Sequence, residues 1–263
     1  MSTFPHPLAA HITALKRRLL IIGVTLLGAF VLTFAYAGEL IQWFKRPFED
    51  DLIFYGPTEA LFASIKVSFL AGVILSLPMI LYQVWKFIEP ALLPREQRWA
   101  IPLLCLAAGM FGLGLVFCNL VILPLVIQFF VSFGMDRELT PQLAVGTYVD
   151  LNVKFLLIFG CAFELPLVLT FLSRLGLVSH RMLSQYRKHA ILIALILSAI
   201  VTPDATLFTM LLMAVPLMVL YEIGILGVRL FGARKSGSGS AGTGSGGPVQ
   251  GELPVGTAGQ RVL

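Results

Sequence analysis

The chain has 263 residues, of which 57% are hydrophobic and only 13% are charged. A soluble domain carries about 25% charged residues, so this composition excludes an ordinary water-soluble globular protein and indicates that lipid is the main solvent. The net charge of +5 does not indicate nucleic-acid binding, because in a membrane protein the location of positive charge matters more than its total. A spanning helix takes about 20 apolar residues, so the length allows about six spans.

The first predicted span follows a basic amino-terminal segment, residues 1–18, which ends in the cluster Lys16–Arg18. The span runs from Leu19 to about Ala37. No small-residue cleavage motif follows it, so we interpret it as a retained span and not as a signal peptide. A loop of about 20 residues comes next and contains Pro47.

Three longer apolar stretches predict spans two to four. They run from about Thr58 to Val84, from Trp99 to about Phe133, and from Thr147 to about Leu172. Charged loops over residues 85–98 and 173–189 follow the second and fourth spans. The third stretch is long enough to tilt or to project beyond the bilayer.

The last two predicted spans are unequal. About 12 apolar residues, from Ala190 to Val201, precede Thr202-Pro203-Asp204, and a longer stretch runs from Leu207 to Phe231. One interpretation is a single broken helix, but Thr-Pro-Asp is typical of turns, which favours two spans. A short fifth span would thin the bilayer locally or pair with a neighbour. The tail, residues 233–263, is rich in Gly and Ser and is predicted to be a disordered cytoplasmic segment.

The basic residues predict the orientation of the spans. Of the 19 Lys and Arg residues, three lie in predicted outer loops (Lys45, Arg46 and Arg137), two lie within spans (Lys66 and Lys154), and the remaining 14 lie in predicted inner segments. Cytoplasmic loops of membrane proteins carry an excess of Lys and Arg. Both termini are therefore expected in the cytoplasm.

Glu164 is the clearest ionisable residue at membrane depth, where such groups are costly and require a reason. It lies well inside the fourth predicted span, two residues before Pro166. It must face a protein interior or a water-filled groove, or stay protonated. Two interpretations stay open: a structural carboxyl satisfied by a neighbouring helix, or a polar site for a partner helix or a proton-linked conformational change.

Other charged residues lie nearer the ends of the spans. Lys66 and Lys154 are expected to snorkel toward the outer interface, and Glu59 and Asp150 lie at similar depth, where they could pair with them. Glu222, in the inner half of the sixth span, could either snorkel or pair.

The inner segment after the second span combines aromatic residues (Tyr82, Trp85 and Phe87) with two carboxylates (Glu89 and Glu96). The aromatic residues fit an interfacial belt, but carboxylates on a side crowded with cations need another explanation. Guanidinium groups bind carboxylates bidentately. Two adjacent arginines in a peptide would therefore suit Glu96 and Glu89.

The motifs of common enzymes are absent from the sequence. The four histidines do not form a zinc pattern, and there is no phosphate-binding loop and no nucleophile elbow. The three cysteines lie in apolar runs and predict no disulfide framework. We expect neither catalysis nor a cofactor nor a metal site.

Seven segments match the motifs of one known family in order and spacing. They are His11–Leu20, Lys45–Pro47, Pro57–Lys66, Leu81–Glu96, Phe163–Pro166, Thr202–Asp204 and Tyr221–Gly224. Over about residues 8–232, the chain resembles TatC, the multispanning receptor subunit of the twin-arginine protein translocase.

The resemblance implies a fold and a function. The fold is an all-α integral membrane protein of the bacterial cytoplasmic (inner) membrane. Its six transmembrane helices, within residues 19–232, form a concave, glove-like bundle with both termini cytoplasmic and short fifth and sixth helices. The function is to bind the signal peptides of folded export cargo, which carry two adjacent arginines. The family also assembles single-span subunits of the TatA/TatB type for translocation driven by the proton motive force, and self-associates in a receptor complex.

The resemblance also assigns a signal-peptide site by position. Glu96 is the acceptor for the arginine pair, Phe87 lies alongside it, and Glu89, Lys16 and Arg17 complete the site. The family's amino-terminal element has a carboxylate followed by Leu-Arg, whereas this chain has Ala14 and Lys16 in those places. Glu89 could take the place of that carboxylate.

Three further roles follow from the resemblance. Glu164 corresponds to the buried carboxyl of the concave groove, and Pro47 supports the outer cap. The fifth and sixth spans form the docking surface for partner helices, with Thr202, Asp204 and Thr209 in it.

Two other classes of protein stay open. A proton-coupled small-solute secondary transporter would be expected to show inverted repeats and a midplane site on broken helices, and we find no internal repeat. A membrane assembly scaffold would leave the inner carboxylates Glu89 and Glu96 without an explanation.

Overall fold

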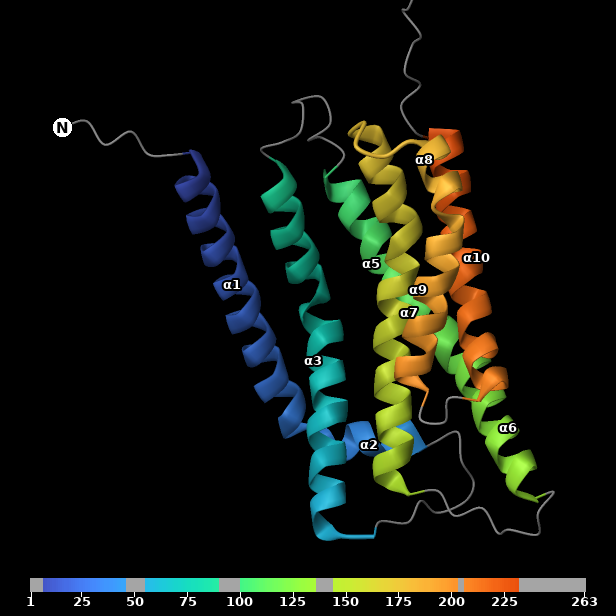
Figure 1. Ribbon diagram of the computed structural model, residues 1–263. Coiled ribbons are helices and arrows are strands. Elements are labelled where there is room, and N and C mark those ends of the chain that lie inside the picture. The colour runs from blue at the N-terminus through green and yellow to red at the C-terminus, as the bar shows by residue number, and fades with distance from the viewer. Residues whose placement is uncertain (1–6, 46–54, 90–99, 136–143, 203–205, 232–263) are drawn as a thin grey trace, which may run out of the picture. The chain divides into compact units, whose positions relative to one another are not determined.

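The computed structural model describes residues 7–45, 55–89, 100–135, 144–202 and 206–231. Their regular elements are all helices, which confirms the predicted all-α class (Figure 1). The helices are α1 (Pro7–Ala35), α2 (Ala37–Lys45), α3 (Pro57–Ile88), α5 (Ala100–Phe117), the π-helical η2 (Cys118–Ile122), α6 (Leu123–Met135), α7 (Val145–Arg174), α8 (His180–Gln185), α9 (Arg187–Val201) and α10 (Leu207–Phe231).

The chain divides into a compact unit, Met1–Ala233, and a second unit, Arg234–Leu263. The helices belong to the first unit. The predicted disorder of residues 233–263 falls outside the described residues, as do Pro47, Glu96 and Asp204.

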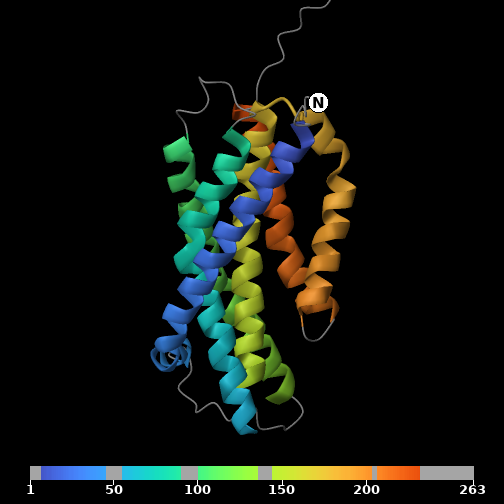
Figure 2. The same ribbon diagram turned by 90° about the vertical axis from the view of Figure 1, so that its left-hand side faces the viewer.

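Five helical segments are long and apolar enough to cross a membrane: α1, α3, the continuous rod α5–η2–α6, α7 and α10. The predicted fifth span corresponds to α9, which has only 15 residues. At 1.5 Å per residue it measures about 22 Å, less than the roughly 30 Å hydrocarbon core of a typical bilayer. In Figure 2 the lower ends of the helices α9 and α10 accordingly stop short of the lower ends of α3 and α7.

The start of the chain contains more helix than the sequence predicted. Helix α1 begins at Pro7 and so includes most of the predicted amino-terminal segment, because its Ala, Leu, Lys and Arg residues are good helix formers. The part of α1 that is long and apolar enough to cross a membrane begins at Leu15. The predicted first loop also contains α2, which lies across the long helices (Figures 1 and 2). Phe44 of α2 is buried, and Leu40 and Ile41 pack against the main core.

The third span is not a regular α-helix. At η2 the N–H of Leu123 donates to the carbonyl of Cys118, one residue farther back than in an α-helix. Pro124 follows directly. It has no N–H, and in a regular helix its ring would clash with the carbonyl of Leu120. The wider π-turn accommodates the proline inside a continuous rod.

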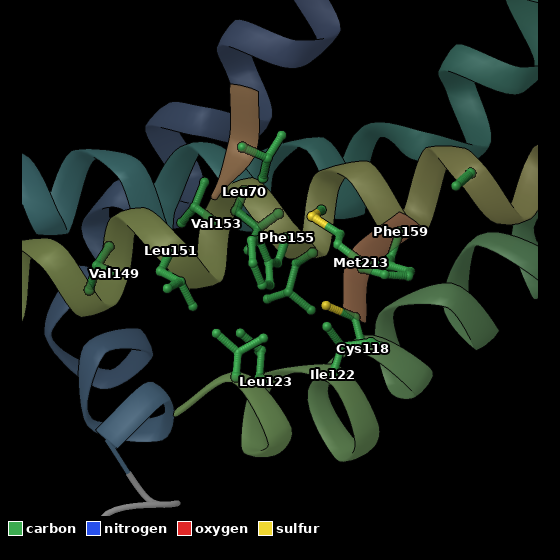
Figure 3. Packing of buried hydrophobic residues seen from close by; sticks show 14 of the residues in the cluster. Leu70, Cys118, Ile122, Leu123, Val149, Leu151, Val153, Phe155, Phe159 and Met213 are labelled. Atoms are coloured by element: carbon green, nitrogen blue, oxygen red, sulfur yellow. The ribbon is translucent and has the colours of Figure 1, made fainter. Parts of the chain in front are cut away.

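The core is centred on α7, which contacts α3, α5, α9 and α10. Phe155 and Phe159 of α7 and Met213 of α10 are completely buried, beside Leu70 of α3 and Ile122 of η2 (Figure 3). A smaller cluster, comprising Leu183, Ile225 and Val228, fixes α8 against α10.

Glycines lie where helices cross closely. A Cβ on Gly114 of α5 would lie 2.6 Å from the carbonyl oxygen of Phe159, so α5 rests directly on the backbone of α7. A Cβ on Gly72 of α3 would lie 3.1 Å from the Cα of Phe30 in α1. Close approach of backbones through small residues is the usual way in which helices associate in lipid, where there is no hydrophobic drive between them.

We expect Gly114→Ala to destabilise the protein by about 1–3 kcal/mol, the usual cost of overpacking. The measurement is thermal unfolding of the purified protein in detergent. Gly109→Ala is the matched control, because a Cβ on Gly109, in the same helix, would meet no atom within 4 Å. Equal unfolding temperatures for the two variants would show that α5 and α7 are not in backbone contact.

Candidate functional site

Four of the residues predicted to bind a signal peptide lie on α1 and at the end of α3, and Glu96 lies outside the described residues. Lys16 and Arg17 are exposed on the third turn of α1. The next residue, Arg18, donates from Nη1 to the carbonyl of Gln83 at 3.4 Å, which links this part of α1 to the last turns of α3. We call this end of the bundle, where α1 begins and α3, α7 and α10 end, the basic end.

Aromatic residues at the end of α3 have opposite environments. Trp85 is buried against Phe171 of α7, with ring centroids 5.4 Å apart, whereas Phe87 is 41% exposed. Trp85 therefore fixes the end of α3 to α7, and Phe87 faces outward. Glu89 is partly buried and closes the helix by donating its backbone N–H to the carbonyl of Trp85.

Glu164 lies on α7, next to the crossing with α5. Its side chain is partly buried, and its Oε1 is fully buried with no hydrogen-bond partner in the described part of the chain. Buried polar atoms without partners are rare and call for an explanation. Cys161 and Leu165 beside it, and Val168 one turn on, are exposed, so the carboxyl sits under an open strip of α7.

Thr202 and Thr209, predicted to dock partner helices, are both buried. The hydroxyl of Thr202 donates to the carbonyl of Ser198 at 2.9 Å, and the hydroxyl of Thr209 lies 2.8 Å from that of Thr206. The two hydroxyls therefore bond within the chain, at the two sides of the turn between α9 and α10.

The opposite end of the bundle, where α3 and α7 begin, has an arrangement that sequence reasoning missed. Glu59 accepts hydrogen bonds from the backbone N–H groups of Gly146, at 2.7 Å, and Tyr55, at 2.8 Å. The hydroxyl of Tyr148 donates to the carbonyl of Phe44 at 3.1 Å, which fixes α2 to α7. The contacts of Glu59 with Gly146 and of Tyr148 with Phe44 join segments 87 and 104 residues apart, so local patterns in the sequence gave no sign of them.

The other charged residues within spans divide into pairs and an exposed cation. Lys66 of α3 forms an ion pair with Asp150 of α7. Arg187 of α9 pairs with Glu222 of α10 at 3.0 Å, so Glu222 pairs and does not simply snorkel. Lys154 is exposed and forms no ion pair with another described residue. Among the described residues, no cluster of His, Cys, Asp or Glu side chains could hold a metal ion.

Comparisons with known proteins point to one family. The family model described as Sec-independent protein translocase protein (TatC) matches residues 10–216. The TatC protein of Aquifex aeolicus (strain VF5) is 40% identical over 225 residues, which cover 83% of this chain and 93% of that protein. The TatC protein of Campylobacter jejuni is 36% identical over 233 residues, covering 84% and 93%.

A solved structure is similar as well. The crystal structure of the twin arginine translocase receptor TatC superposes with a TM-score of 0.78 at 38% identity and covers 84% of this chain and 98% of that one. A second crystal structure of TatC, in DDM, gives a TM-score of 0.76 at 39% identity.

We expect Asp150→Asn to destabilise the protein only while Lys66 is present. In a double-mutant cycle with Lys66→Met, the coupling should be about 0.5–1 kcal/mol, at the lower end for contacting residues because both side chains are partly exposed. Lys154→Met is the control and should show no coupling to Asp150→Asn beyond about 0.3 kcal/mol. The measurement is unfolding in detergent. Strictly additive effects of Lys66→Met and Asp150→Asn would contradict the ion pair.

Proposed function

Because the chain belongs to the TatC family of Sec-independent protein translocase proteins, we propose that it is the receptor that binds twin-arginine signal peptides at the basic end of its bundle. As a member of this family it is a multi-pass membrane component of a protein translocase, a transport subunit and not a catalyst. The similar solved structure is named a twin arginine translocase receptor, and the proposal extends that role to this chain.

The exposure of Phe87 is the observation that carries the proposal. The end of α3 is fixed on one side to α7 through Trp85 and on the other to α1 through Gln83. A large aromatic side chain that stays exposed on such a fixed end is available to a ligand. Glu96 lies outside the described residues, nine positions after Phe87 in the chain, and the proposal places its carboxylate with Phe87.

The chemistry of the basic end fits a peptide with two arginines. A carboxylate receives a guanidinium group through two parallel hydrogen bonds, which lysine cannot imitate. Glu96 supplies this acceptor in the proposal, and Glu89, seven residues earlier in the chain, is the second carboxylate. Lys16 and Arg17 are cations on the neighbouring helix, and they would repel a basic peptide that is not held by the carboxylates.

We expect a signal peptide with paired arginines and a photoreactive group to crosslink to this region, and Glu96→Ala to reduce the crosslinking at least tenfold, which corresponds to about 1.4 kcal/mol. A charge-assisted hydrogen bond is worth about 1.5–3 kcal/mol, which sets the expected size. The measurement is the crosslinked fraction on full-length protein in membranes.

Two controls accompany this experiment. Glu39→Ala removes an exposed carboxylate from α2, at the opposite end of the bundle, and should leave crosslinking unchanged. A peptide with paired lysines should crosslink weakly to every variant. Undiminished crosslinking to Glu96→Ala would contradict the proposed site.

The proposal includes a topology of six spans with both termini in the cytoplasm of a bacterium. The five segments that could cross a membrane give an odd number of crossings, and α9 as a sixth would return the chain to its starting side. The cations Lys86, Arg174 and Arg229 lie on the last turns of helices at the basic end, and Lys16 and Arg17 lie on the third turn of α1. The positive-inside rule assigns this end to the cytoplasm. The concave, glove-like form implied by the family belongs to the same proposal.

Partner helices are proposed to dock on α9 and α10. Exposed aliphatic residues lie along both helices, including Ile193 and Ile200 of α9 and Leu211 and Val215 of α10. The buried hydroxyls of Thr202 and Thr209 would shape this surface from beneath and not touch a partner directly. Single-span subunits of the TatA/TatB type and further copies of the receptor are the proposed partners.

Glu164 is proposed to serve translocation through its carboxyl group. A structural role would require a donor to its buried Oε1, and none lies in the described residues, so an incoming polar group or water is the expected partner.

We expect Glu164→Gln, which keeps the shape and removes the ionisable group, to reduce export of a twin-arginine cargo at least tenfold while the protein accumulates normally in the membrane. The measurement is export of a reporter cargo in cells in which the variant is the sole source of this protein. Glu222→Gln is the control, because that carboxylate is exposed and paired with Arg187. Normal export by Glu164→Gln would rule out an essential titration at this position.

A further inference from the structure

A narrow groove runs along α1, away from the sites described above. It has a volume of about 410 Å³, and its walls include Gly23, Leu27 and Phe30 of α1, Phe69 of α3 and Val153 of α7. The volume lies within the range of about 300–1,000 Å³ that is usual for small-molecule sites. Almost the whole wall is apolar, so the groove fits a hydrocarbon ligand.

The one polar side chain in the described wall of the groove is that of Lys66, and it lies at one end. Helices α1 and α3 are antiparallel, with the hydroxyl of Thr33 bonded to the carbonyl of Ser68 at 2.7 Å and the Cα of Phe30 against Gly72. Lys66 therefore lies farther than Phe30 toward the opposite end of the bundle, and Gly23 lies farther toward the basic end. The groove therefore has a cation, Lys66, at one end, and apolar side chains line the rest of its wall.

The cationic end lies at the boundary of the bilayer. Lys66 is about 33 Å from the last residue of α3, Ile88, and Lys154 is about 30 Å from the last residue of α7, Arg174, at 1.5 Å per residue. The hydrocarbon core is about 30 Å thick. When the basic end sits at one interface, both lysines therefore reach the headgroup region of the other leaflet.

The charges at this level leave one cation in excess. Lys66 is paired with Asp150. Lys154 is one turn from Asp150 on the same face of α7, because residues four apart are neighbours on a helix. The side chains of Lys66 and Asp150 are 42% and 37% exposed, and Lys154 is exposed as well. Two cations and one carboxylate within reach of lipid favour an anionic ligand.

The groove is small beside a transmembrane helix. A helix about 10 Å across encloses roughly 420 Å³ in each turn of 5.4 Å, so the groove's 410 Å³ matches about one turn. Its wall on α1 extends from Gly23 to Phe30, or about 10 Å along the axis. An acyl chain is thinner than a helix and can lie along this length.

We propose that the groove binds one anionic phospholipid of the leaflet at the opposite end of the bundle. The phosphate of the lipid lies beside Lys66 and Lys154, and one acyl chain runs along α1 toward Gly23. The bound lipid fills the space between α1 and the α3–α7 pair, which the protein leaves empty.

The test is native mass spectrometry of the full-length protein in detergent, titrated with phosphatidylglycerol or with phosphatidylethanolamine. Gly23→Leu places a side chain in the groove, and it is expected to reduce the first bound phosphatidylglycerol at least fivefold. Gly28→Leu is the matched control on the same helix. A Cβ at either position meets no atom within 4 Å, but Gly28 is not part of the wall. A second filling variant, Leu27→Trp, should act like Gly23→Leu.

The headgroup is tested separately. Lys154→Gln should reduce the preference for phosphatidylglycerol over phosphatidylethanolamine roughly fivefold, since a basic residue near anionic lipid contributes about that factor. The double variant Lys66→Gln/Asp150→Asn, which removes both charges of the pair, should weaken the preference further. Equal lipid binding by Gly23→Leu and Gly28→Leu, or an unchanged preference in Lys154→Gln, would overturn the proposal. Retention of a protein partner in place of lipid would overturn it as well.

Discussion

The packing of this protein depends on direct backbone contact at α7. In lipid the helices gain nothing from hiding apolar side chains, so association must come from close packing. Gly114 lets α5 rest on the backbone of α7 near Phe159, and Gly224 and Gly227 bring α10 against Pro166 and Thr170 of the same helix. Because α7 is approached on several sides, Phe155 and Phe159 are completely buried although the molecule is surrounded by hydrocarbon.

The same contacts determine what faces lipid. The side of α7 that is not covered by α5 or α10 carries Asp150, Lys154, Cys161 and Glu164 at helical spacing. An ionisable group at membrane depth is costly unless it is paired or faces the bundle interior or water. Asp150 is neutralised by Lys66, whereas Glu164 has a buried oxygen with no donor in the described residues. The strip thus combines a compensated pair with an exposed cation, Lys154, near one end and an uncompensated acid deeper in the span.

Much of the fold could be predicted because a long stretch of apolar residues is a strong signal of a membrane-spanning helix. The bounds predicted for spans two, four and six lie within a few residues of α3, α7 and α10, and Glu164 stood out by its depth alone. Helix α2 was missed because its amphipathic pattern fills only nine residues and its docking depends on Tyr148, far away in the chain. The bond of Glu59 to the backbone N–H of Gly146, 87 residues away, was missed because its partner is also distant in the chain. Local patterns reveal which groups are costly in lipid, but not which distant backbone group satisfies them.

The π-turn at η2 inserts one extra residue into the third span and so changes the rotational register of α6 relative to α5. Each added residue rotates the helix beyond it by about 100°, so the extra residue in this turn sets the face that α6 presents to the core. Cys118 and Ile122 within the turn and Val126 after it are all buried. A chain shortened by one residue here would form an ordinary helix, and α6 would then turn Val126 toward lipid. The packing of α6 therefore depends more on how many residues separate Phe117 from Pro124 than on which residues they are.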